Sequence, residues 1–168
     1  MTTVRTFTIA GGDFGSRQTL GKMRGLVNRA LTDPTVITTA KDVVAYVPPG
    51  DFEGQAMAIG SWLAEHFQFV RDPLGVELLH EPRYMLQVID RRAFFSGDCD
   101  DAAVLGAALA KAVGLRARFR AIGFRRGGLL SHVIADVWTP RGWVQYDVTR
   151  PAQFTRLPRV ARSLIVEV

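Results

Sequence analysis

The stretch SGDCDDAAVLGAALAKAV, residues 96–113, places the only cysteine of the chain, Cys99, directly before a long apolar run. Residues 99–113 carry apolar side chains on most sides of a predicted helix, and a helix that is apolar all round is a buried one. Gly114 follows and suits the left-handed residue that ends many helices. The stretch therefore predicts a buried central helix with a thiol in its first turn.

Helices are predicted mainly before this stretch and strands mainly after it. Hydrophobic spacing and turn residues predict helices over about 16–30, with Ser16 as the N-cap, 34–46 and 52–67, and a short one over 84–88. Alternating residues predict strands over about 1–10, 115–124, 131–138, 143–148 and 163–168, and an extended segment at 69–70. This order, helices first and an antiparallel sheet second, indicates an α+β fold.

Composition is that of an ordinary globular domain, and 168 residues predict one domain over residues 1–168. A single cysteine excludes an internal disulfide and fits a reducing compartment. No apolar run is long enough to span a membrane, and the N-terminus lacks the apolar core of a signal peptide, so we expect a cytoplasmic protein. The net charge of +5 comes without a nucleic-acid-reading motif, which favours a solvated basic surface.

Cys99 is a candidate nucleophile. A helix N-terminus offers partial positive charge and free N–H groups, which lower the pKa of a thiol and can hold an oxyanion. Asp98, Asp100 and Asp101 act the other way, because nearby negative charge disfavours the thiolate. The thiol is therefore expected to need a basic partner, for which His132 is the candidate. The alternative is a buried structural cysteine.

His132 and Asp147 lie on consecutive predicted strands. A turn within residues 139–142 would place His132 opposite Thr149, and Asp147 would then be a diagonal neighbour of His132 on the same face. A bulge at Gly142 would move the two side chains to opposite faces. The alternatives are a core histidine and a carboxylate at the end of the sheet.

Other groups of residues give weaker indications of a functional site. His66 lies in a predicted helix and His80 in the irregular segment 74–95, which could form one wall of a cleft. A metal site could draw on Cys99, His132 and the three aspartates, Asp98, Asp100 and Asp101. One thiol among hard carboxylates is a mixed ligand set, however, and no second His or Cys has the short spacing of zinc sites.

These residues together resemble the transglutaminase-like superfamily. The cysteine segment is carried by 97–101 and 113–119, the His segment by 131–133, and the Asp segment by 143–149. Residues 69–73 with Val76 and Glu77 are similar to bacterial and phage-associated members. The resemblance covers about residues 55–150.

The resemblance implies a papain-like α+β core with Cys99 as nucleophile, His132 as general base and acid, and Asp147 as the orienting acid. It implies attack on a peptide or amide carbonyl and a thioester intermediate, with no metal or cofactor. The apolar runs and the absence of a reading motif, described above, predict no membrane or nucleic-acid partner. Hydrolysis is favoured over transamidation, because the chain lacks the extra domains of calcium-dependent transglutaminases. Tyr84 and Gln87 are guesses for a side-chain oxyanion donor. The alternatives are an amine-accepting transamidase and a non-catalytic phage or prophage structural or assembly protein that keeps the fold.

Overall fold

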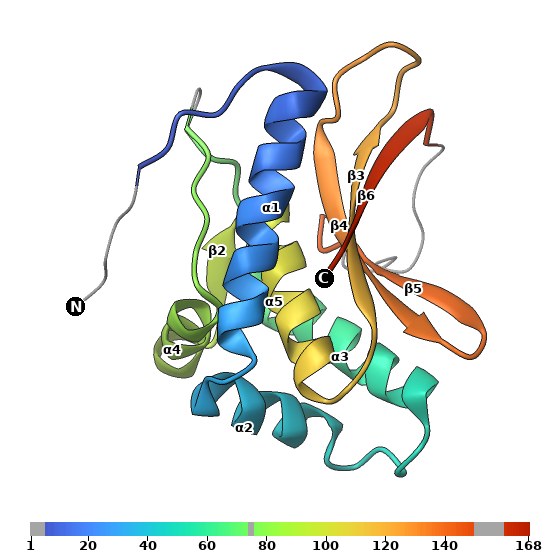
Figure 1. The fold of residues 1–168 in the computed structure, drawn as a ribbon. Coiled ribbons are helices and arrows are strands. Elements are labelled where there is room, and N and C mark those ends of the chain that lie inside the picture. Colours follow the sequence, from blue (N-terminus) through green and yellow to red (C-terminus); the bar gives the residue numbers. More distant parts are fainter. Residues whose placement is uncertain (1–5, 74–75, 150–159) are drawn as a thin grey trace.

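A computed structural model of the chain describes residues 6–73, 76–149 and 160–168 (Figure 1). Its helices are α1 (Gly12–Ala30), α2 (Pro34–Val44), α3 (Phe52–His66), α4 (Pro82–Arg92) and α5 (Cys99–Ala112). Its strands are β1 (Phe67–Phe69), β2 (Phe95–Gly97), β3 (Ala117–Gly123), β4 (His132–Thr139), β5 (Gly142–Tyr146) and β6 (Arg162–Glu167). The order confirms the predicted α+β class.

Helix α5 is the centre of the molecule. It packs against the other four helices and against the sheet, and every residue from Asp100 to Ala110 is buried. The small residues of α5 allow this close approach. A Cβ on Gly106 would lie 2.8 Å from Leu63 Cδ1 and 2.8 Å from Tyr146 Cδ2. The apolar run read from the sequence is therefore a core helix, as predicted, and Gly114 ends it with φ +87°.

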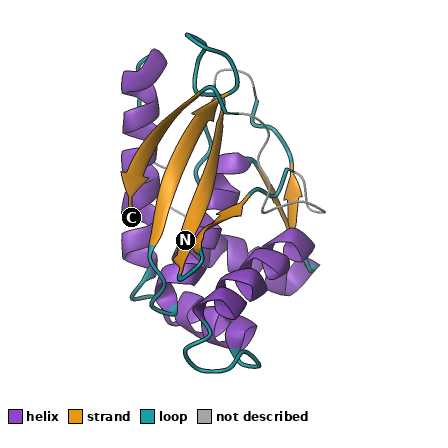
Figure 2. Ribbon diagram, turned by 90° about the vertical axis from the view of Figure 1, so that its right-hand side faces the viewer, coloured by secondary structure: helices purple, strands orange, loops and turns teal. Residues whose placement is uncertain are grey.

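The main sheet has the strand order β5-β4-β3-β6, with every neighbouring pair antiparallel, and lies across the helices (Figure 2). Strands β4 and β5 pair with Ala135 opposite Tyr146 and Thr139 opposite Gly142. This is the register that the turn within 139–142 predicts. A separate parallel pair, β1 and β2, matches Phe69 with Gly97 and so fixes the chain just before Cys99.

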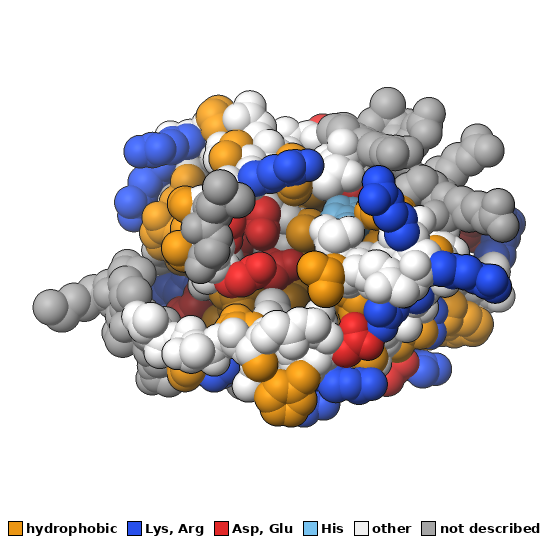
Figure 3. All heavy atoms as spheres, turned by 90° about the horizontal axis from the view of Figure 1, so that it is seen from above, with side chains coloured by type: hydrophobic (Ala, Val, Ile, Leu, Met, Phe, Trp, Pro, Cys, Tyr) orange, Lys and Arg blue, Asp and Glu red, His pale blue; other side chains and the backbone are white. Residues whose placement is uncertain are grey.

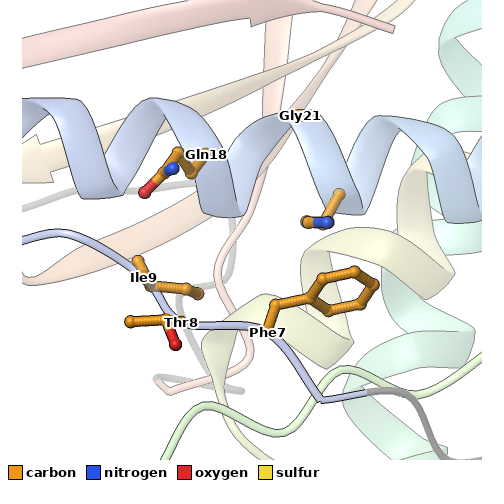
Figure 4. A pocket seen from close by; sticks show the side chains of 6 residues that line it. Phe7, Thr8, Ile9, Gln18 and Gly21 are labelled. Carbon is orange, nitrogen blue, oxygen red and sulfur yellow. The ribbon is translucent and has the colours of Figure 1, made fainter.

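The N-terminal prediction is wrong where it can be compared. Residues 6–10 form no strand, and residues 1–5 lie outside the described part of the chain. The segment instead runs along α1, where the backbone N–H of Ala10 donates to Gln18 Oε1 and the ammonium of Lys22 lies 3.2 Å from the Phe7 ring centre (Figure 4). The residues alternate in polarity, but they pair with no strand of the described sheets.

Two helix boundaries also differ from the prediction. Helix α1 begins at Gly12, and Ser16 lies inside it, where its hydroxyl donates to the Gly12 carbonyl instead of capping the helix. Helix α4 extends over Pro82–Arg92, well beyond the predicted 84–88, because Pro82 starts it and Ala93 ends it in the left-handed conformation. None of the helices in the described ranges combines the length and the apolar character needed to cross a membrane.

Candidate active site

Cys99, His132 and Asp147 line the same cleft, which has a volume of about 670 Å³. Its walls come from α1, residues 69–72 with Glu77, the start of α5, the end of β3 with the loop to β4, and the residues after β5. Acidic side chains gather around a hollow on this side of the molecule, with a histidine at its edge (Figure 3). The fold thus brings together all three residues that the sequence singled out.

Asp98 fixes the start of the cysteine helix. Its Oδ1 accepts hydrogen bonds from the backbone N–H groups of Asp100 at 2.9 Å and of Asp101 at 3.4 Å, as an N-cap residue does. Cys99 is consequently the first residue of α5, as the sequence predicts.

The environment of the Cys99 thiol keeps it protonated. Burial raises its pKa, and the neighbouring carboxylates of Asp100 and Asp98 raise it further. The backbone N–H of Val133 acts in the opposite direction but does not outweigh these effects. The thiol donates to Asp100 Oδ1 at 3.6 Å, and no hydrogen bond joins it to His132 in the described part of the chain. The helix N-terminus was expected to lower the pKa of the thiol, but burial and the two aspartates outweigh this effect.

His132 begins β4 and is held by Asp147, which follows β5. The His132 Nε2 lies 3.1 Å from Asp147 Oδ1, and the backbone N–H and hydroxyl of Thr149 donate to the same oxygen at 3.1 and 2.6 Å. Burial alone would raise the pKa of Asp147, but these hydrogen bonds outweigh burial and lower it. The pairing leaves Nδ1 of the ring without a bond to Asp147.

Four carboxylates form one side of the cleft, and we call Asp72, Glu77, Asp98 and Asp100 the acidic wall. Burial, then Asp72 and Asp101, raise the pKa of Asp98 to about 6. Burial, then Asp98 and Glu77, raise that of Asp100 well above its ordinary value. The wall is the part of the cleft that the sequence did not reveal, although segment 74–95 was expected to contribute a wall.

Two overlapping sets of side chains could hold a metal ion. Asp98, Cys99 and Asp100 offer ligand atoms within 4.8 Å of one another, and so do Asp72, Glu77 and Asp98. The second set is all oxygen, which suits a hard cation such as Ca²⁺ or Mg²⁺. His132 and Asp101, which the sequence also made candidates, belong to neither set.

Asp101 has a different partner. It is fully buried, and its two oxygens accept from the backbone N–H and from Nδ1 of His80, each at 2.8 Å. The His80 ring stacks on Tyr84 and meets Phe95 edge-on. This second His–Asp pair joins the segment that carries Glu77 to the helix that carries Cys99, a link that sequence spacing gave no means to find.

The remaining sequence candidates lie elsewhere. His66 bonds the Trp62 carbonyl through Nδ1 at 2.8 Å and stacks on the Trp62 ring, away from the cleft lining. Tyr84 and Gln87, the guesses for an oxyanion donor, are not in the lining either, because α4 turns Tyr84 towards His80 and Phe95.

Comparisons with known proteins agree with this architecture. A search of curated proteins found no match. Among solved structures, the chain is similar to one from Cytophaga hutchinsonii described as a candidate cysteine protease, with a TM-score of 0.52 and 16% identity. The match covers 91% of this chain and 61% of that protein, so the chain spans less than two thirds of its length.

The family comparison is more specific. The model of the transglutaminase-like superfamily matches residues 38–148, which is more than half of the chain and includes Cys99, His132 and Asp147. The match starts in α2, earlier than the resemblance at 55–150 that the motifs gave. The chain belongs to the transglutaminase-like superfamily.

Proposed function

We propose that the chain catalyses cysteine-dependent acyl transfer, with hydrolysis of a peptide or amide bond as its reaction. The observation that supports this is the cleft shared by Cys99, His132 and Asp147, with the His132 ring bonded to Asp147 at 3.1 Å. A thiol, a base and a group that orients the base are the parts that nucleophilic catalysis requires.

In this proposal the Cys99 thiol gives its proton to His132 Nδ1, the ring nitrogen that Asp147 does not bind. The thiolate attacks the carbonyl carbon, and the tetrahedral intermediate collapses with cleavage of the C–N bond while His132 returns the proton to the leaving amine. Water then attacks the thioester and loses a proton to His132, and the C–S bond breaks as His132 returns that proton to the Cys99 sulfur. Because the resting thiol bonds Asp100, its side chain must turn towards His132 before the first step.

The oxyanion needs a donor near Cys99. Asp98 already occupies the N–H groups of Asp100 and Asp101. We therefore assign the oxyanion to the backbone N–H of Cys99 itself, at the positive end of α5.

An activated ester tests the proposal without knowledge of the natural substrate. With p-nitrophenyl acetate, Cys99 should take the acetyl group as a thioester and release nitrophenolate in a burst of one equivalent per chain. We expect His132→Ala to slow acylation by about 10²- to 10⁴-fold and Cys99→Ala to abolish it. His66→Gln, which alters a histidine outside the cleft, is the control and should leave the rate unchanged.

The same experiment separates the alternatives. If wild-type Cys99 is acylated no faster than a small thiol, the catalytic proposal is wrong and a structural role for the fold is favoured. If acylation is fast and the thioester is released only after a primary amine is added, transamidation replaces hydrolysis.

A further inference from the structure

Building on the function proposed above, we propose that the acidic wall selects substrates with a positively charged group, such as a lysine or arginine side chain, beside the reacting carbonyl. The wall lies next to the thiol, since Asp98 and Asp100 flank Cys99 in the sequence and all four carboxylates line its cleft. A substrate whose carbonyl reaches Cys99 would therefore place a neighbouring group against these carboxylates.

Asp100 is the residue that points most directly to a ligand. The described ranges contain four buried aspartates, Asp100, Asp101, Asp136 and Asp147. Three of them have basic partners: Asp101 binds His80, Asp136 binds Arg118 and Arg120, and Asp147 binds His132. Asp100 is only 7% exposed and lines the cleft, yet its side chain contacts the Cys99 thiol at 3.6 Å and the carboxyl group of Glu77 and has no basic partner among the described residues.

The other carboxylates of the wall also have no basic partner among the described residues, although Arg71 lines the same cleft. Within the described chain, no Lys, Arg or His nitrogen lies within 4.0 Å of a carboxylate oxygen of Asp72, Glu77, Asp98 or Asp100. Buried charge is unfavourable unless it is paired and hydrogen-bonded. Ligand atoms of Asp72, Glu77 and Asp98 lie within 4.8 Å of one another, so an incoming cation would relieve the repulsion between these carboxylates.

The size and lining of the cleft favour an organic cation over a lone ion. About 670 Å³ is far more space than one metal ion fills, and Leu20, Met23 and Leu130 add apolar surface to the same cleft. A lysine or arginine side chain has both parts that this lining accommodates, an aliphatic stem and a charged end. Two of the four carboxylates are already hydrogen-bonded to the backbone, because Asp98 caps α5 and Asp72 accepts from the backbone N–H of Leu78. Asp100 and Glu77 are thus the main ligands expected for the cation.

The lone cysteine makes a direct test available. Methanethiosulfonate reagents form a disulfide with the Cys99 sulfur and release methanesulfinate, and they exist in cationic (trimethylammonium-ethyl), anionic (sulfonato-ethyl) and neutral (methyl) forms. The rate with each reagent is measured on the whole chain by mass spectrometry and divided by its rate with 2-mercaptoethanol. The ratio of the cationic to the anionic rate then reports the charge that a ligand meets beside the thiol.

We expect a normalised cationic-to-anionic ratio of about 30-fold or more at low ionic strength, falling as salt is added. Glu77→Gln and Asp72→Asn should each reduce the ratio by about three- to tenfold. Glu65→Gln and Asp90→Asn remove exposed carboxylates outside the cleft and should leave it unchanged. Circular dichroism of each variant shows that the fold is retained.

A ratio near one in the wild type overturns the inference, as does a thiol that reacts with none of the three reagents. Micromolar binding of calcium chloride in a calorimetric titration, abolished by Glu77→Gln, would assign the wall to a metal and overturn it too. The ratio does not depend on acyl transfer. A high ratio without acylation by p-nitrophenyl acetate therefore contradicts only the proposed function, and acylation without charge selectivity contradicts only this inference.

Discussion

Asp147 holds the His132 ring through a single oxygen that also serves two other donors. Its Oδ1 lies 3.1 Å from His132 Nε2 and accepts the N–H and the hydroxyl of Thr149 as well. A ring held at Nε2 presents Nδ1 as its second nitrogen, so the contact defines which nitrogen can take the thiol proton.

This geometry predicts different effects for two substitutions at position 147. An asparagine oxygen can still accept all three hydrogen bonds, so Asp147→Asn should keep the ring orientation and lose only the charge. We expect it to slow acylation of Cys99 by about 10-fold and Asp147→Ala by about 10²-fold or more, because alanine leaves the ring unoriented. The burst rate with p-nitrophenyl acetate measures both. Equal losses in the two variants would show that charge, and not orientation, is the contribution of Asp147.

The features that could be predicted from the sequence are those that depend on a continuous run of residues or on a short turn. The buried α5 could be predicted because its residues are apolar on most sides. The β4–β5 register followed from a short turn, and it is what brings His132 and Asp147 to one edge of the sheet.

Contacts between segments far apart in the chain could not be predicted. His80 and Asp101 are 21 residues apart, and His80 lies in an irregular segment whose path no periodicity defines. The acidic wall is a second example, since Asp72 and Glu77 line the same cleft as Cys99 although they lie far from it in the sequence. The alternating N-terminus gave a false strand signal, because alternation does not show whether a partner strand exists.

Gly97 offers a test of how tightly the start of α5 is packed. A Cβ at Gly97 would lie 2.5 Å from Asp101 Oδ2 and 2.8 Å from Phe95 Cε1. Asp101 cannot yield easily, because His80 holds both of its oxygens. Gly97→Ala should therefore lower the free energy of unfolding by about 1–3 kcal/mol in urea denaturation.

Gly21→Ala is the matched control for that change. Position 21 lies within α1 and has no atom within 4 Å of an added Cβ, so alanine should stabilise the protein by about 0.5–1 kcal/mol. Two substitutions of the same chemistry should thus have opposite signs. A neutral or stabilising Gly97→Ala would mean that the β2–α5 junction is looser than the structure shows.

Because the pKa of the Cys99 thiol is raised, we expect its alkylation rate to depend on pH. Burial is the largest cause of its raised pKa and Asp100 is the next. Asp100→Asn removes one of the two flanking charges, so the midpoint of the iodoacetamide rate-against-pH profile should fall, and the rate at pH 8 should rise about three- to tenfold. The midpoint should stay above that of a free thiol because burial is unchanged. An unchanged profile, with Asp90→Asn as the reference, would show that burial alone sets the thiol pKa.

We expect the His80–Asp101 pair to contribute to the free energy of unfolding by an amount that depends on pH. The hydrogen bond that His80 donates to Asp101 raises the His80 pKa, burial opposes this, and the charge of Asp101 raises the pKa further. A raised histidine pKa contributes stability that is fully present below the unfolded value of about 6.5 and is lost as pH rises through the folded value. The charged form of the pair should therefore stabilise the fold at pH 6 and not at high pH.

Two variants separate the charge from the hydrogen bond. In His80→Asn the side-chain N–H₂ takes the place of Nδ1 and keeps the bond to Asp101 without the charge, whereas His80→Leu loses both. Urea denaturation should show wild type exceeding His80→Asn by about 1 kcal/mol at pH 6 and matching it at high pH. His80→Leu should be less stable by about 1–3 kcal/mol throughout, because it leaves the buried Asp101 oxygen without its donor. If the free energies of unfolding of wild type and His80→Asn differ by the same amount at every pH, protonation of His80 does not contribute to stability.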